Sequence, residues 1–150
     1  MTSDCWPPHA YVPGQTARHP EGLFDPLKTG LSDVAPSDLV GTSAWTSGLA
    51  FLNEGYFWEA HEVLEAVWLA CPPNSPERLM VQAVIQYANA CLKGRMGQPR
   101  AMARLMTLSD DLACEAVDRA GGAVLGLNGG MCKIMHKKVD EESRAGKKCI

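Results

Sequence analysis

The sequence predicts an all-α protein, built as a compact bundle of about four to five helices with an extended, proline-rich N-terminal arm. Apolar residues recur at helical spacing from Thr42 onward, and no segment shows the sustained alternation of a strand. Six of the 10 prolines lie in the first 36 residues, where fixed φ angles and missing N–H donors exclude a long helix. The 150 residues, 46% hydrophobic and 21% charged, are typical of one globular domain.

Three regions are predicted along the chain. Residues 1–36 form the arm, and its Trp6, Tyr11 and Phe24 indicate that it packs on the body of the domain. Residues 37–120 form the helical core. Residues 121–150 begin with a glycine-rich break and continue as a charged helix over about 131–143 and a tail.

Local signals place the core helices. Ser75 is a good N-cap, Pro76 suits a first helical position, and Gly94 is the expected stop of the same helix. Gly48 and Ala60 are small enough for close contact between the first two helices, a spacing that resembles one tetratricopeptide helix pair. The predicted helices cover 44–53, 56–71, 76–93 and a segment that opens at Pro99.

Charge and hydropathy narrow the classes of function. No apolar run is long enough for a membrane helix, and the first ten residues lack a signal peptide, so we expect a cytoplasmic protein. The net charge is −3, with a modest basic cluster at Lys93, Arg95, Arg100 and Arg104. Nucleic-acid binders usually carry a stronger basic bias, so nucleic acid is not favoured as a partner.

The six cysteines lie far apart and form no CxxC pair. In a chain without an export signal, this pattern predicts reduced thiols used for packing, rather than disulfides or a thiolate metal site.

The second predicted helix carries the first candidate site. His61 lies at the edge of its apolar arc, Glu65 lies one turn away on the same face, and Glu62 lies further out. An imidazole and a carboxylate at this spacing can bind a divalent metal ion, so His61 and Glu65 are candidate metal ligands. Glu59 is nearly opposite the arc and is expected to be solvated, and Trp58 lies off the arc and could be exposed.

The run from His61 to Glu65 is similar to the zinc-peptidase HExxH motif, with glutamate in place of the second histidine. The replacement removes a nitrogen ligand, and no third ligand is identifiable downstream. The pattern therefore does not favour a zinc peptidase, and no reaction is identified from the sequence.

Two further groups could complete a site. Gln82 and Gln86 lie on one flank of the third helix, where they would face His61 and Glu65 across a polar cleft. Arg18, His19 and Glu21 lie in a short, proline-limited part of the arm, and Arg18 could pair with a helix carboxylate.

Four motifs together resemble the family catalogued as domain of unknown function 309. They are YVPG at 11–14, RHPEG at 18–22, GYFWEAHEVLE at 55–65 with Trp68, and QAVIQ at 82–86. The likeness runs from about Tyr11 to Leu105. It implies a small all-α domain of prokaryotes and plastids, with the glutamate–histidine helix as its signature and no established activity.

Two hypotheses follow. In the first, His61, Glu62 and Glu65, together with Gln82, Gln86 and the arm residues, bind a divalent metal ion or a small polar ligand. In the second, the chain is a helical-hairpin interaction module without catalysis, which binds a protein partner or forms a homo-oligomer. Its support is the tetratricopeptide-like spacing and four tryptophans, because exposed aromatic residues often anchor interfaces.

Overall fold

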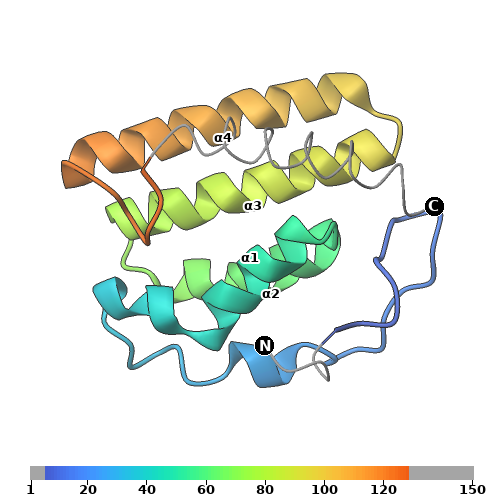
Figure 1. Ribbon diagram of the computed structural model, residues 1–150, viewed down its shortest axis with the longest axis horizontal. Helices are drawn as coiled ribbons and strands as arrows, with labels where there is room; N and C mark the ends of the chain where they lie inside the picture. Colours follow the sequence, from blue (N-terminus) through green and yellow to red (C-terminus); the bar gives the residue numbers. More distant parts are fainter. Residues whose placement is uncertain (1–5, 129–150) are drawn as a thin grey trace.

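The computed structural model describes residues 6–128, and its regular elements are all helices. Within this range the only strand-like feature is one isolated bridge between Val124 and Leu127, so the predicted all-α class is confirmed. Figure 1 shows α3 and α4 side by side, with α1 and α2 packed beneath them. The elements are η2 (Asp25–Lys28), η3 (Pro36–Gly41), α1 (Ser43–Asn53), α2 (Phe57–Ala70), α3 (Pro76–Arg95) and α4 (Pro99–Ala120).

The helix ends follow the local chemistry of the sequence. The Thr42 side chain accepts a hydrogen bond from the Trp45 N–H and caps α1. The Ser75 side chain accepts from the Arg78 N–H and caps α3, as predicted, with Pro76 in the first helical position. Helix α4 ends at Gly121, whose φ of 71° is the left-handed conformation that glycine adopts most readily.

Helix α3 continues through Gly94 to Arg95, past the stop predicted at Gly94. A Cβ atom on Gly94 would lie 2.7 Å from Met102 Sδ, so this glycine lets α4 approach α3 closely. The turn is made instead at Gly97, whose φ is +73°.

Helices α1 and α2 make an equally close contact. Gly48 is buried, and a Cβ atom there would lie 2.6 Å from Leu64 Cγ. Leu64 and Ala60 are fully buried on the facing side of α2. The small residue predicted at position 48 therefore sets the distance between the first two helices.

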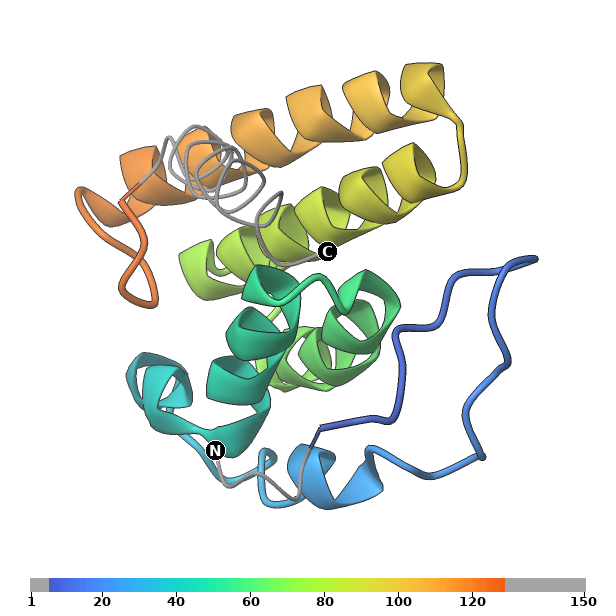
Figure 2. The same ribbon diagram turned by 45° about the vertical axis from the view of Figure 1, so that its right-hand side comes forward.

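The arm, defined from here on as residues 6–35, lies along the α1–α2 side of the bundle (Figure 2). Trp6 packs on Phe51 and on Tyr56, with ring centroids 5.4 Å apart in both pairs. Phe24 packs on Phe51 at 5.8 Å. These aromatic contacts join the arm to the core.

One prediction falls wholly outside residues 6–128 and another falls partly outside them. The charged helix expected over 131–143 and the cysteines Cys5, Cys132 and Cys149 are not described, and the division into three regions stays a prediction. Within the described residues, no helix combines the length and the apolar character needed to cross a membrane.

Cys71, Cys91 and Cys114 are free cysteines. Burial is the main reason that the pKa of Cys71 and that of Cys91 are both raised to about 11. Cys114 is exposed on α4.

We therefore expect iodoacetamide at pH 8 to alkylate Cys114 first. Cys114 is the exposed thiol of the three, and at this pH a thiol with a pKa near 11 is only about 0.1% thiolate. The buried thiols of the folded protein keep their protons until the pH approaches 11, so their labelling should accelerate as the pH rises toward that value. In the unfolded chain the same thiols lose their protons at lower pH, so the folded state should lose stability over this range. Peptide mass mapping checks the order, with urea-unfolded protein as the control. Equal native rates at Cys71 and Cys114 would contradict it.

Candidate functional site

Glu59, on the first turn of α2, is fully buried, so the prediction that it is solvated is wrong. Trp58 is half-buried rather than exposed. The physical reason is the arm, which covers the face of α2 that lies opposite the helix's own apolar arc. An isolated helix would leave both side chains in water.

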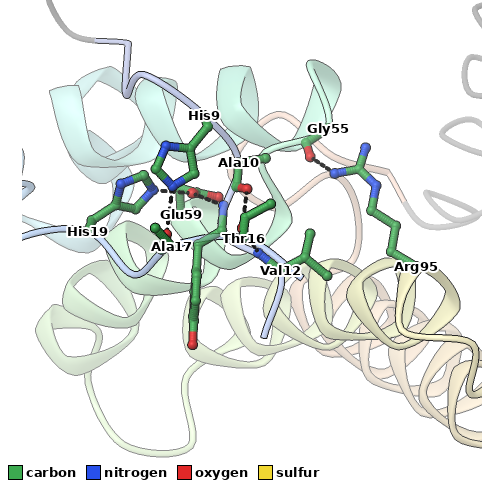
Figure 3. Close-up of polar contacts among 10 residues, drawn as sticks. His9, Ala10, Val12, Thr16, Ala17, His19, Gly55, Glu59 and Arg95 are labelled. Atoms are coloured by element: carbon green, nitrogen blue, oxygen red, sulfur yellow. Dashed lines mark hydrogen bonds and ion pairs between the residues drawn. The ribbon is translucent and has the colours of Figure 1, made fainter. Parts of the chain in front are cut away.

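The Glu59 carboxylate fastens the arm to α2 through one oxygen. Its Oε2 atom accepts a hydrogen bond from the Tyr11 backbone N–H at 2.8 Å. The same oxygen lies 2.7 Å from Nε2 of His19, which donates the second hydrogen bond. The side chains of His19 and Glu59 are 2% and 0% exposed, so this is a buried imidazole–carboxylate pair. Figure 3 shows both side chains meeting at the edge of α2.

One atom of each partner is left without a hydrogen bond. Among the described residues, neither His19 Nδ1 nor Glu59 Oε1 has a partner, although both atoms are buried. Each unpaired buried polar group costs about 1–3 kcal/mol, and such groups recur where a structure has a role besides stability.

Aromatic rings enclose the pair. The His9 ring lies over the His19 ring, with centroids 4.7 Å apart, and its Nε2 donates to the Ala17 carbonyl at 2.6 Å. Phe24 meets His19 edge-on at 5.6 Å, and Trp58 lies 6.1 Å away. These rings and the two hydrogen bonds fix the imidazole in place.

A cavity of about 460 Å³, which we call the arm cavity, opens beside this pair. Lys28 and Glu62 meet across it, with Nζ and Oε2 3.5 Å apart. Arg18 lies in its lining but has no ion pair within residues 6–128, so the predicted pairing of Arg18 with a helix carboxylate is replaced by pairs from His19 and Lys28. The arm cavity is lined by Arg18, His19, Pro20, Glu21, Gly22, Leu23, Phe24, Asp25, Lys28, Trp58 and Glu62.

The remaining predicted site residues lie elsewhere. His61, Glu65, Gln82 and Gln86 line a separate cavity of about 150 Å³ between α2 and α3, as expected if the two helix flanks face one another. The single site predicted from the sequence is therefore divided in two. Arg18, His19, Glu21 and Glu62 belong to the arm cavity, and the other four belong to the contact between α2 and α3.

The expected metal pair is loosely arranged. His61 Nε2 and Glu65 Oε2 are 3.9 Å apart, and the Glu65 side chain is 53% exposed. Over residues 6–128, no three histidine, cysteine, aspartate or glutamate side chains are grouped so as to hold a metal ion. The described structure gives no support to a metal site at His61 and Glu65.

Arg95, predicted as part of a basic cluster, contacts the loop before α2 and the start of that helix. Its guanidinium donates to the Gly55 carbonyl (Figure 3). It also lies over the Phe57 ring, 4.3 Å from the centroid. Partial burial lowers the pKa of Arg95, and the nearby Cys91 and Glu59 act in the opposite direction. The side chain therefore supports the start of the helix that carries Glu59.

Comparison with known proteins locates the family signal. Residues 45–105 match the family described as Domain of unknown function (DUF309). This segment is similar to DUF309 domains. It spans α1, α2, α3 and the beginning of α4, which confirms the resemblance suspected from the helix motifs. No curated protein and no solved structure matches the chain.

The DUF309 segment contains Glu59 but not its partners on the arm, since Tyr11 and His19 precede residue 45. The arm cavity is thus built between the matched segment and a segment outside the match. Glu59 was not among the predicted site residues. The signal that could have found it is Trp58, because an aromatic residue off the apolar arc indicates a second covered face.

Proposed function

We propose that this chain binds a small organic amine in the arm cavity. The observation that carries the proposal is the excess of carboxylates around Trp58. Three carboxylates line the cavity, those of Glu21, Asp25 and Glu62, and the Glu59 carboxylate lies behind its wall. The lining contains two lysine or arginine side chains, Arg18 and Lys28. These four carboxylates outnumber the basic side chains even when His19 is counted as positively charged.

Two features of the lining suit a cationic head group. Glu62 already pairs with Lys28, so an ammonium group could share this carboxylate. Trp58 also lines the cavity, and the face of an indole ring attracts cations by about 0.5–2 kcal/mol depending on exposure. The volume of about 460 Å³ is in the range of small-molecule sites.

The buried pair gives this cavity a fixed wall. Because His19 and Glu59 are held by each other and by the surrounding rings, the adjoining lining residues of the arm keep their positions relative to α2. A preformed site loses less entropy when it binds a ligand.

Titration calorimetry with 1,4-diaminobutane tests the proposal, with 1,4-butanediol as the uncharged probe of the same length. We expect saturable binding of the diamine and none of the diol. Glu62→Gln should weaken binding about tenfold, because it removes one carboxylate and leaves Lys28 unpaired. The matched control is Glu54→Gln, an exposed glutamate that lies outside the cavity lining. Equal affinity for the diamine and the diol, or no binding of either, would refute an amine site.

The exposed large apolar residues do not favour the alternative of a protein-interaction module. Leu23, Val40, Leu69 and Leu108 are exposed, but they come from the arm, η3, α2 and α4 in turn. Single apolar residues on a surface are ordinary in soluble proteins.

A further inference from the structure

A second site lies along the contact between α2 and α3, away from the arm cavity. Two cavities of about 150 and 200 Å³ lie there, and Trp68 and Gln82 line both. The two cavities therefore adjoin at these side chains, and we call them together the seam groove. Its further lining residues are His61, Glu65, Ile85 and Gln86 in one half, and Pro73, Asn74, Arg78 and Leu79 in the other.

The seam groove has charges of opposite sign in its two halves. The Arg78 guanidinium lies over the Trp68 ring, 3.9 Å from the centroid. Within residues 6–128, Arg78 makes no ion pair, so the edges of its guanidinium fork are free to meet an anion. Glu65 lies in the other half, one helical turn before Trp68, and its only ionic neighbour in the same range is His61 at 3.9 Å.

The middle of the groove offers hydrogen bonds that the described protein does not use. Trp68 Nε1 is buried and has no acceptor among residues 6–128. The Gln82 side chain lies in the lining of both halves, and that of Gln86 lies in the half that holds Glu65. A primary amide can donate to a carbonyl and accept from an N–H at the same time, so the two glutamine side chains can bind a peptide unit.

From this arrangement we propose that the seam groove binds a small zwitterion of dipeptide size. The ligand's carboxylate pairs with Arg78, because a guanidinium fork matches a carboxylate in two hydrogen bonds. Its ammonium group pairs with Glu65, and its central peptide unit meets the amide groups of Gln82 and Gln86. The arm cavity, in contrast, is lined by an excess of carboxylates and suits a purely cationic molecule.

The test uses dialanine as the probe and the Trp68 indole N–H resonance as the readout, assigned with Trp68→Phe. We expect a saturable shift of this resonance. N-acetyl-dialanine, which lacks the ammonium group, and dialanine amide, which lacks the carboxylate, should each bind more weakly than dialanine. The doubly blocked N-acetyl-dialanine amide should leave the resonance unmoved.

Two variants connect the binding to named residues. Arg78→Gln should weaken dialanine binding about tenfold, and Glu65→Gln about threefold, the smaller effect arising because water screens the half-exposed Glu65 carboxylate. Arg100→Gln and Glu54→Gln are matched controls on exposed residues outside the groove. No shift of the Trp68 resonance at millimolar dialanine, or equal binding by all four probes, would overturn the proposal. The probe and the substituted residues differ from those used for the arm cavity. One proposal can therefore be refuted while the other stands.

Discussion

Replacing Glu59 with alanine is expected to lower the free energy of unfolding by about 3 kcal/mol. The variant removes the acceptor of both hydrogen bonds that join the arm to α2. It also leaves a cavity beside His19, whose side chain is nearly as buried as that of Glu59. Urea denaturation followed by circular dichroism measures the change.

Two further variants separate the carboxylate from the mere presence of a side chain. Glu59→Gln keeps one acceptor oxygen and the side-chain volume, so it should lose about half as much stability as Glu59→Ala. Glu54→Gln, on an exposed glutamate close by in the sequence, should be nearly neutral. A Glu59→Ala protein within about 0.5 kcal/mol of the parent would show that the pair does not stabilise the fold.

Gly48→Ala is expected to destabilise the protein by about 2 kcal/mol, although alanine is the better helix former by roughly 1 kcal/mol. The new Cβ atom would enter the space of Leu64, with Cγ only 2.6 Å away. Leu64 is fully buried, so its side chain has little room to move aside. Thermal or urea denaturation gives the size of the loss.

The control for Gly48 is a double-mutant cycle with Leu64→Ala. Shortening Leu64 opens the space that the new methyl group needs, so Gly48→Ala should become neutral or stabilising in that background. Gly122→Ala, where a Cβ atom would meet nothing within 4 Å, serves as the unhindered comparison. If Gly48→Ala stabilised the otherwise unchanged protein, the contact between α1 and α2 would be looser than described.

The helices could be predicted from the sequence because their signals are local. A serine cap before a proline at Pro76 and the prolines after α2 act within a few residues. The sequence does not predict that α3 continues to Arg95, because Gly94 does not end the helix. It instead makes room for the Met102 side chain of α4. That role depends on a neighbouring helix, which no local pattern contains.

The candidate site was harder to predict because its contacts are distant in sequence. His19 was identified as a candidate, but its partner Glu59 lies 40 residues away and was assigned to solvent. The helical period of α2 describes only the face turned toward the core. It carries no information about the arm, which covers the opposite face and brings Tyr11 and His19 to Glu59.

Hydrogen exchange at the Tyr11 amide reports whether Glu59 holds the arm on α2. This N–H donates to Glu59 Oε2 at 2.8 Å. We expect slow exchange of the Tyr11 amide in the parent protein and fast exchange in Glu59→Ala, while buried amides of α3 stay protected in both. If the Tyr11 amide exchanged in the parent protein as fast as in an unfolded chain, the hydrogen bond to Glu59 would not hold the arm on α2.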